Sequence, residues 1–242
     1  LMSMFKNNSC PFPGLRPYRS SESNIFFGRE REVEDSLSIL QQYKLVTITG
    51  DNGSGKTSLI DAGLIPKIQK GFSGQQGKEW SICKFRPGVS PIENLSNSLS
   101  ERGGLYLGGK AKTTDYENYK KILESKLELG LVEIFKNSEI FEKRNLLIII
   151  DQIEDLFKFK KFFDFDATLD DNLLFNIIYR TSRYKETPIY FIIAIDNEFI
   201  SKLNSYDRFT ELLNYTQYSI PNITQNTIQE IINDTFHKRN VQ

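Results

Sequence analysis

The chain has 242 residues, and its 31 Lys and Arg residues balance its 31 Asp and Glu residues, so the formal net charge is +0. This length is sufficient for one large α/β domain with its own hydrophobic core. The balanced charge excludes recognition of nucleic acid or of a membrane by bulk charge, and one histidine with two cysteines leaves little material for a zinc site.

Residues 1–23 are rich in Pro, Ser, Asn and Arg, a composition that predicts little regular structure. We therefore expect an irregular lead-in over residues 1–28. Hydrophobic periodicity then predicts helices and strands in alternation. The expected helices are 29–42, 56–68 with Pro66 at a kink or near the end, 92–99, 173–184, 197–203 and 227–237, and the stretch 116–141 is expected to be mainly helical. The expected strands are 45–49, 80–85, 146–150, 189–195 and 215–220, and residues 102–115 are expected to form a loop or an ordered insertion.

Alternation of this kind predicts an α/β fold with parallel strands and right-handed crossovers. Helices on both faces of the sheet would make a three-layer sandwich, with a mainly parallel central sheet of about five strands. The longest apolar run, 189–195, is too short to cross a bilayer, and the first residues given lack the charged-then-apolar pattern that a signal peptide would show. We therefore expect a cytoplasmic protein without a membrane partner.

A glycine-rich segment follows the first expected strand and precedes a helix. It matches the P-loop, or Walker A, pattern at every fixed position, from Gly50 to Gly55, Lys56 and Thr57. With the alternating strands and helices, this motif predicts the α/β fold of a P-loop NTPase three-layer sandwich. Glycines let the backbone N–H groups converge on phosphate oxygens, and the helix N-terminus adds its positive dipole end. We expect Lys56 to reach the β- and γ-phosphates and Thr57 to bind Mg²⁺. The alternative is a glycine-rich turn that only joins a strand to a helix. The residues expected to line the nucleotide here are Gly50, Asp51, Asn52, Gly53, Ser54, Gly55, Lys56, Thr57 and Ser58.

Asp151 follows an apolar strand, as the Walker B aspartate does, and is expected to hold Mg²⁺ directly or through water. Glu154 is our first candidate for the carboxylate that orients and deprotonates the attacking water, and Asp155 is the second. Gln152, which comes directly after Asp151, cannot act as a base. The alternative is that both acids only complement a helix dipole.

Several motifs together resemble the novel STAND NTPases, over residues 11 to about 231. They are Pro11-Phe12-Pro13-Gly14-Leu15-Arg16-Pro17-Tyr18, Phe26-Phe27-Gly28-Arg29-Glu30, the P-loop, Phe85-Arg86-Pro87-Gly88 and Ile150-Asp151-Gln152-Ile153-Glu154-Asp155. The resemblance implies a signal-transduction ATPase that switches between a closed form and an oligomeric form. It also implies fused or separate sensor and effector modules and, in many bacterial relatives, a role in antiviral defence.

The resemblance also implies further contacts with ATP or ADP. Phe27, Gly28 and Arg29 would help to hold the adenine and ribose, although Arg29 has the alternative of being a solvated residue at a helix start. Pro221 begins a segment that is similar to the exit towards a helical lid. The expected domains are therefore the lead-in 1–28, which contributes to the nucleotide site, a core at 29–222 and the start of a truncated lid at 223–242.

One position departs from the family pattern, because Asp196 follows the strand 189–195 where relatives commonly carry an arginine that senses the γ-phosphate. An acid there would repel a triphosphate, unless it bound Mg²⁺ or an arginine, and this favours slow or conditional hydrolysis. The alternative is that Asp196 caps the following helix. A nucleotide-binding scaffold that never hydrolyses is the second functional hypothesis. A P-loop kinase or transferase is the third.

Overall fold

The computed structural model describes residues 12–14, 16–71, 78–101, 103–107, 113–160, 168–225, 228–229 and 231–234. A five-stranded sheet forms its centre, with the strand order β2-β3-β4-β1-β5 and parallel pairing between all neighbours. The strands are β1 (Leu45–Gly50), β2 (Glu79–Phe85), β3 (Arg144–Ile150), β4 (Ile189–Asp196) and β5 (Gln217–Ser219). The predicted α/β fold with a mainly parallel sheet of about five strands is confirmed.

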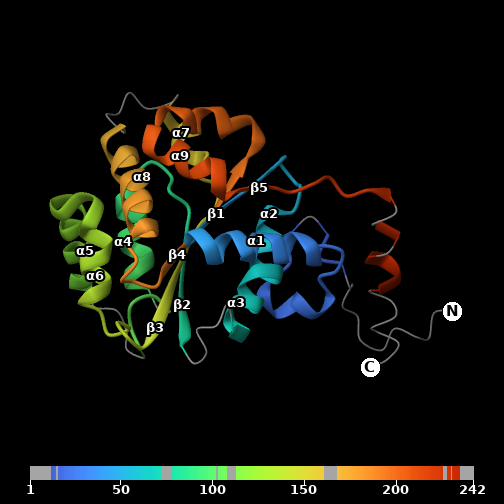
Figure 1. Ribbon diagram of the computed structural model, residues 1–242, viewed down its shortest axis with the longest axis horizontal. Helices are drawn as coiled ribbons and strands as arrows, with labels where there is room; N and C mark the ends of the chain where they lie inside the picture. The colour runs from blue at the N-terminus through green and yellow to red at the C-terminus, as the bar shows by residue number, and fades with distance from the viewer. Residues whose placement is uncertain are drawn as a thin grey trace.

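Helices cover both faces of this sheet, so the molecule has three layers (Figure 1). One face carries α1 (Glu30–Tyr43), α2 (Lys56–Ser58), the π-helical segment η2 (Leu59–Leu64) and α3 (Ile65–Gly71). The other carries α4 (Pro91–Ser100), α5 (Thr113–Lys126), η3 (Leu127–Leu129), α6 (Gly130–Lys136) and α8 (Thr168–Arg183). Three further helices follow β3 and β4, namely α7 (Asp155–Lys160), the 3-10 helix η4 (Asn197–Ser205) and α9 (Asp207–Thr216).

The central strands are apolar on both sides because each side faces a helical layer. In β3, Leu147 and Ile149 pack with the α1–α3 layer, whereas Ile148 and Ile150 pack with the opposite layer. All four side chains are 0% exposed, and burial of each stabilises the fold by roughly 1.5–3 kcal/mol. This double-sided core holds the carboxyl ends of β1, β3 and β4 side by side.

The stretch 116–141, expected to be mainly helical, is helical over most of its length. It is divided into α5, the 3-10 turn η3 and α6. Leu127 at the break has a φ of 50°, a left-handed conformation that no helix interior contains. Gly130 then packs against the backbone of Leu123, where a Cβ atom would come within 2.8 Å of the Leu123 Cα atom.

The helix predicted at 56–68 forms, but η2 widens it in the middle. The N–H of Ile65 donates to the carbonyl of Ile60, five residues earlier, which is the π-helical pattern. Pro66 comes directly after this wide turn, at the second residue of α3. A proline has no N–H to donate and is tolerated in the first turn of a helix, so the π turn accommodates it.

The strand predicted at 215–220 begins two residues later than predicted, at Gln217. Residues up to Thr216 belong to α9, and β5 contains only residues 217–219. Phe209, Leu212, Leu213 and Thr216 are buried at helical spacing, and their packing decides the conformation there. The helix expected at 197–203 is 3-10 in type and extends to Ser205.

The ends of the chain also differ in detail from the expectations. The lead-in ends in a 3-10 helix, η1 (Ser20–Ile25), and residues 228–229 and 231–234 are helical. The rest of the expected helix 227–237, residues 1–11, and residues 102 and 108–112 of the expected loop 102–115 lie outside the described residues. Within that expected loop, Thr113 already begins α5.

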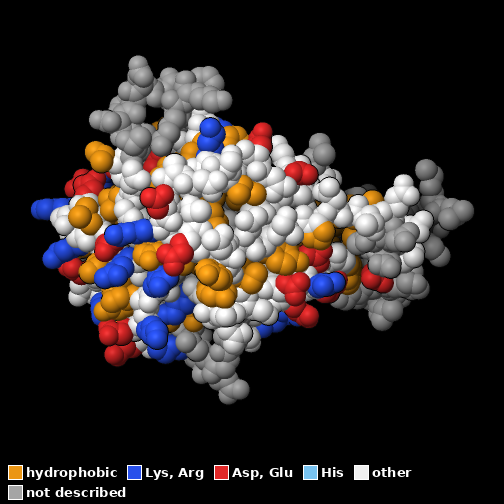
Figure 2. Space-filling view, turned by 45° about the horizontal axis from the view of Figure 1, so that its top comes forward, with side chains coloured by type: hydrophobic (Ala, Val, Ile, Leu, Met, Phe, Trp, Pro, Cys, Tyr) orange, Lys and Arg blue, Asp and Glu red, His pale blue; other side chains and the backbone are white. Residues whose placement is uncertain are grey.

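Acidic and basic side chains are mixed over the surface in Figure 2. Several form exposed pairs, such as Arg208 with Glu128 at 3.2 Å and Lys136 with Glu186 at 3.3 Å. Each such pair contributes little to stability. In the described part of the chain, no helix combines the length and apolar character that crossing a membrane requires.

Candidate functional site

The P-loop joins the carboxyl end of β1 to the start of α2. Gly53 and Gly55 have φ angles of 79° and 93°, which L side chains rarely adopt. A Cβ atom at Gly50 would come within 2.5 Å of Ser54 Oγ. The loop therefore depends on its glycines, and α2 begins directly after it at Lys56, as a phosphate-binding helix N-terminus does.

The ammonium group of Lys56 is turned into this loop. It donates to the carbonyl oxygens of Gly50 and Asp51, each at 2.9 Å, and to Asp196 Oδ1 at 2.6 Å. The side chains of Lys56 and Asp196 are both 10% exposed. A buried cation in such a loop can bind an anionic ligand. Here the Lys56 ammonium is already paired with a carboxylate of the same chain, that of Asp196.

Thr57 and Asp151, predicted from distant motifs, lie together. Thr57 Oγ1 donates to Asp151 Oδ1 at 3.4 Å. Two residues that the sequence reasoning missed adjoin them: Lys84 Nζ lies 3.5 Å from Asp151 Oδ2 and 2.7 Å from Asp61 Oδ1. The alternation of β2 was the available signal, because Lys84 points to the same face of the sheet as the P-loop helix.

Glu154 and Asp155 are placed by a sharp turn after β3. Gln152 has a φ of 59°, and the turn brings Glu154 Oε2 within 3.4 Å of the backbone N–H of Asp196. Glu154 is 2% exposed, and burial raises its pKa, with a smaller contribution from the Asp196 charge. Burial also raises the pKa of Asp155. Lys158, on α7, pairs with Glu154 at 3.5 Å.

The alternative that Asp196 caps η4 is wrong. Asp196 is the N-cap residue by position, but its side chain makes no capping hydrogen bond. Instead its carboxylate binds Lys56, because β4 is the neighbour of β1 and Asp196 is in register with Gly50. Next to it, Asn197 Nδ2 donates to Asp51 Oδ1 at 2.7 Å.

Arg29 is 6% exposed, so the alternative of a solvated residue is wrong. Its guanidinium donates to Glu32 Oε1 at 2.8 Å, to the carbonyl of Pro221 at 2.9 Å and to that of Ser54 at 3.4 Å. Arg29 thus connects the start of α1, the P-loop and the exit from β5. Whether it also contacts adenine or ribose stays a prediction.

The remaining predicted residues surround this connection. Gly28 has a φ of 76° and donates its N–H to Glu30 Oε1 at 3.2 Å, and Phe27 before it is half-buried. Ser58 Oγ accepts a hydrogen bond from the N–H of Tyr18 at 3.1 Å, which fastens the lead-in to the P-loop helix. Asn52, Gly53 and Pro221 are exposed. Tyr18 belongs to the lead-in motif Pro11–Tyr18, but no local pattern singles it out within that motif.

The residues present fit a phosphate and a magnesium ion. Ser54 Oγ is buried in the loop without a hydrogen-bond partner, and the same loop holds the Lys56 ammonium that Asp196 binds. Thr57 and Asp151 present oxygen ligands, which are the donors that Mg²⁺ prefers.

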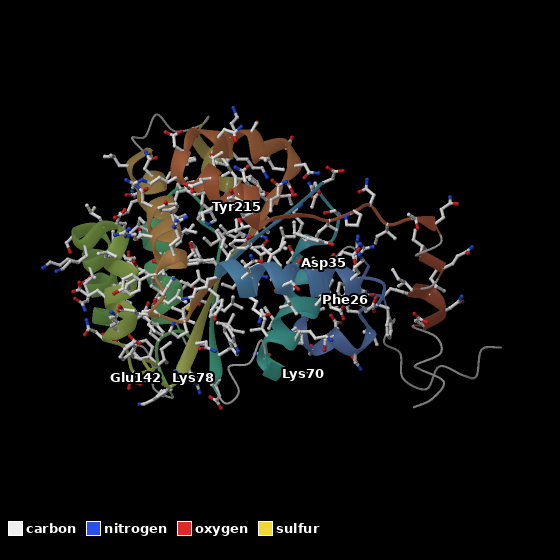
Figure 3. The ribbon with its side chains drawn as sticks, viewed as in Figure 1. Phe26, Asp35, Lys70, Lys78, Glu142 and Tyr215 are labelled. Carbon is white, nitrogen blue, oxygen red and sulfur yellow. The ribbon has the colours of Figure 1, made fainter. Side chains whose placement is uncertain are left out.

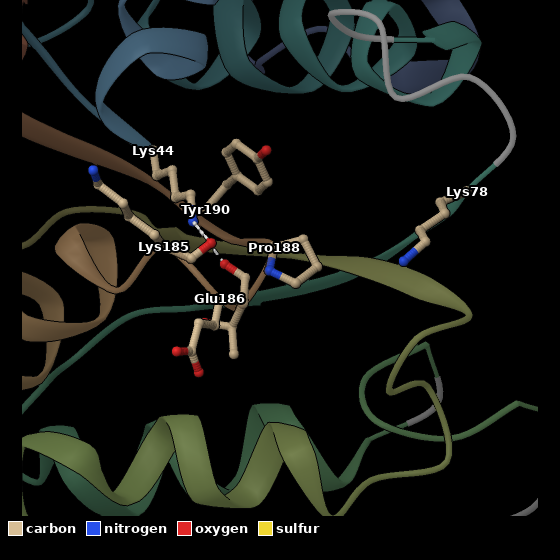
Figure 4. Close-up of a pocket in the computed structure, with 7 residues that line it drawn as sticks. Lys44, Lys78, Lys185, Glu186, Pro188 and Tyr190 are labelled. Carbon is tan, nitrogen blue, oxygen red and sulfur yellow. Dashed lines mark hydrogen bonds between the residues drawn. The ribbon is translucent and has the colours of Figure 1, made fainter.

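Two hollows elsewhere carry no comparable chemistry. One, of about 380 Å³, lies near the amino ends of the strands, and Lys44 lines it (Figure 4). The Lys44 ammonium donates to three backbone carbonyls there, of Tyr184, Lys185 and Thr187, so its role is structural. The second, of about 310 Å³, lies between the lead-in, α1 and α3, where Figure 3 labels Phe26 and Lys70.

The geometry agrees with a comparison of the chain with protein families. The model of the Novel STAND NTPase 1 family matches residues 11–242. The chain belongs to this family. No curated protein matches this STAND NTPase.

Solved structures show the same fold. The ORC2 protein of Aeropyrum pernix, solved as ADPNP-ADP complexes, aligns at a TM-score of 0.59 and 14% identity, over 96% of this chain and 56% of that one. The ORC1 protein of the same organism, solved in complex with DNA, aligns at a TM-score of 0.53 and 14% sequence identity, over 87% of this chain and 49% of that one. This STAND NTPase thus spans about half the length of the structures that it matches.

Proposed function

We propose that this STAND NTPase is a nucleotide-dependent switch that binds ATP, or ADP, with Mg²⁺ and hydrolyses ATP slowly or conditionally. The observation that carries the proposal is the buried Lys56 ammonium in the P-loop, 2.6 Å from Asp196 and next to the paired Thr57 and Asp151. A glycine-rich turn that only joined a strand to a helix would not need a buried cation. The nucleotide state would control self-association and signalling through sensor and effector modules, in the cytoplasm and, as in many bacterial relatives, in antiviral defence.

Each part of the site has a role in binding. The loop N–H groups and the α2 N-terminus hold phosphate oxygens, and Lys56 neutralises the β- and γ-phosphates. Thr57 and Asp151 would hold Mg²⁺, which supplies charge neutralisation between the phosphates. The nucleotide base, which we propose is adenine, would lie against Phe27, Gly28 and Arg29.

Glu154 is the residue we propose as the general base, with Asp155 as the second candidate. Its burial at 2% exposure supports this role, because a carboxylate with a raised pKa accepts a proton more readily. The nearby Asp196 supports slow turnover, because no arginine stands at that place to neutralise the γ-phosphate.

The test of binding is calorimetric titration of Lys56→Ala with ATP and MgCl₂. We expect affinity to fall by about a hundredfold or more, which corresponds to roughly 2.7 kcal/mol for one charge-assisted phosphate contact. Lys67→Ala, an exposed lysine on α3, is the matched control and should bind as the wild type does. Because Lys56→Ala leaves Asp196 buried without its partner, the double variant Lys56→Ala/Asp196→Asn should also be titrated. Wild-type affinity in both Lys56 variants would remove the basis of the proposal.

The second candidate, a scaffold that binds without hydrolysing, is favoured by the same Lys56–Asp196 pair. Phosphate release at saturating ATP from the full-length, partner-activated protein separates the two. The switch predicts release that Glu154→Gln abolishes while ATP affinity is retained. The scaffold predicts that neither protein releases phosphate.

A further inference from the structure

The carboxylate of Asp196 lies between two lysines. Its Oδ1 atom accepts a hydrogen bond from Lys56 at 2.6 Å, and its Oδ2 atom is 3.9 Å from the ammonium of Lys158. The two cations come from different elements, since Lys56 begins α2 and Lys158 lies on α7. An anion is thus held between a buried P-loop cation and a second cation that is 40% exposed.

Apart from its pairs with the two lysines, this carboxylate makes no hydrogen bond or ion pair in the described part of the chain. It does not cap η4. Glu154, a second acid, approaches the backbone N–H of Asp196 at 3.4 Å, so two carboxyl groups share this corner. Burying like charges together is unfavourable unless cations compensate them, and Lys56 and Lys158 are the compensating cations.

The position of Asp196 is set by the sheet. It is in register with Gly50, the first residue of the P-loop, and the adjacent Asn197 donates to Asp51 at 2.7 Å. The segment 196–197 therefore flanks the loop from β4. An anion that binds Lys56 must either share this cation with the Asp196 carboxylate or displace it.

We propose that Asp196 is a built-in anionic competitor for the terminal phosphate, and that it makes the site favour a nucleoside diphosphate over the corresponding triphosphate. The inference rests on the proposed nucleotide binding. A diphosphate can share Lys56 while the carboxylate stays in place. A triphosphate brings a further negative group towards the carboxylate, and the repulsion is strong where water is excluded. Lys158 limits the penalty because it can pair with either anion.

The test is titration of ADP and ATP, each with MgCl₂, into four proteins: wild type, Asp196→Asn, Lys158→Met and Asp207→Asn. Asp196→Asn keeps an oxygen that accepts from Lys56 but removes the charge. Asp207 is an exposed acid at the start of α9. Its variant therefore changes the net charge by the same amount as Asp196→Asn, but outside the P-loop. Thermal unfolding without nucleotide establishes that each variant is folded.

We expect Asp196→Asn to tighten ATP binding by about tenfold, with a smaller change for ADP, so the ratio of the two dissociation constants shifts towards ATP. Lys158→Met should shift this ratio severalfold towards ADP, and Asp207→Asn should leave it unchanged. A purely structural role of Asp196 would weaken both nucleotides together and would overturn the inference. So would an unchanged ratio.

Failure of the proposed function gives a different result. If the wild type binds ADP but not ATP and Asp196→Asn binds both, the competitor inference is supported and a wild-type switch that hydrolyses ATP is not. If no variant binds either nucleotide, both are overturned.

Discussion

The guanidinium of Arg29 donates a hydrogen bond to the carbonyl of Pro221 at 2.9 Å, which joins residues 192 positions apart in the chain. The same group pairs with Glu32 at 2.8 Å and reaches the P-loop carbonyl of Ser54 at 3.4 Å. One side chain therefore links the first turn of α1, the P-loop and the segment that leaves β5. A structural role for Arg29 is present in this geometry, whatever its contacts with a nucleotide.

Arg29→Met should lower the free energy of unfolding by about 2 kcal/mol or more, because a buried charged hydrogen-bond network is lost and Glu32 remains without its partner. Arg31→Met is the matched control, since Arg31 is 90% exposed and pairs with Asp35 only at 3.7 Å. Urea denaturation measures both variants. Equal midpoints for the two would contradict the structural role.

Lys84 is expected to weaken Mg²⁺ binding, because its ammonium lies 3.5 Å from the proposed metal ligand Asp151. Lys84→Met should lower the Mg²⁺ concentration at half-maximal ATP binding by about twofold to fivefold, or ~0.5–1 kcal/mol for a partly exposed pair. Lys84→Arg, which keeps the charge, should leave this concentration nearly unchanged. A higher Mg²⁺ requirement in Lys84→Met would show instead that Lys84 orients Asp151 for the metal.

Glu154 predicts a pH dependence of stability. Burial, with help from the Asp196 charge, raises its pKa above the ordinary value of 4.5, and the Lys158 charge opposes the rise. At a pH between the ordinary pKa of 4.5 in the unfolded state and the raised pKa in the folded state, the folded state binds more protons. Ionisation of Glu154 therefore lowers the free energy of unfolding as the pH rises above 4.5.

Glu154→Gln cannot ionise and should therefore gain stability relative to the wild type as the pH is raised from 4 to 7. Thermal melting of both proteins across this range measures the gap. Glu198→Gln is the control, since Glu198 is an exposed acid on η4. A constant gap for Glu154→Gln would show that the carboxyl is not held in a desolvated state.

Gly63, in η2, packs closely against α1. A Cβ atom there would lie 2.6 Å from Val33 Cγ2 and 3.3 Å from Phe26 Cε1. Although alanine is the better helix former, Gly63→Ala should cost about 1 kcal/mol or more through overpacking. Val33→Ala removes the nearest methyl group, so the Gly63 change should cost about 1 kcal/mol less in that background. Additive effects in denaturation experiments would contradict the close packing.

The sequence predicted the parts of this molecule that follow from local patterns. The buried strands β3 and β4 and the P-loop between β1 and α2 each carry a short-range signal, namely an apolar run or fixed glycine spacing. Parallel pairing then brings Thr57 to Asp151, although 94 residues separate them.

Features that depend on tertiary contacts were not predictable in this way. The helix at 116–141 breaks at Leu127 without a proline or glycine at that residue, and α9 continues to Thr216 because its apolar face packs against the core. The partner of Asp196 was missed for the same reason. Its capping role was reasonable from local sequence, whereas the pairing with Lys56 depends on β4 lying beside β1.

The most direct test of the account is a crystal structure grown with excess ATP and MgCl₂. It should show the β-phosphate inside the loop 50–57 in contact with Lys56, and Mg²⁺ at about 2.1 Å from Thr57 Oγ1 with Asp151 bound to it directly or through one water. A loop that stays empty under these conditions, or an Asp151 carboxylate directed away from the metal, would contradict the central claim.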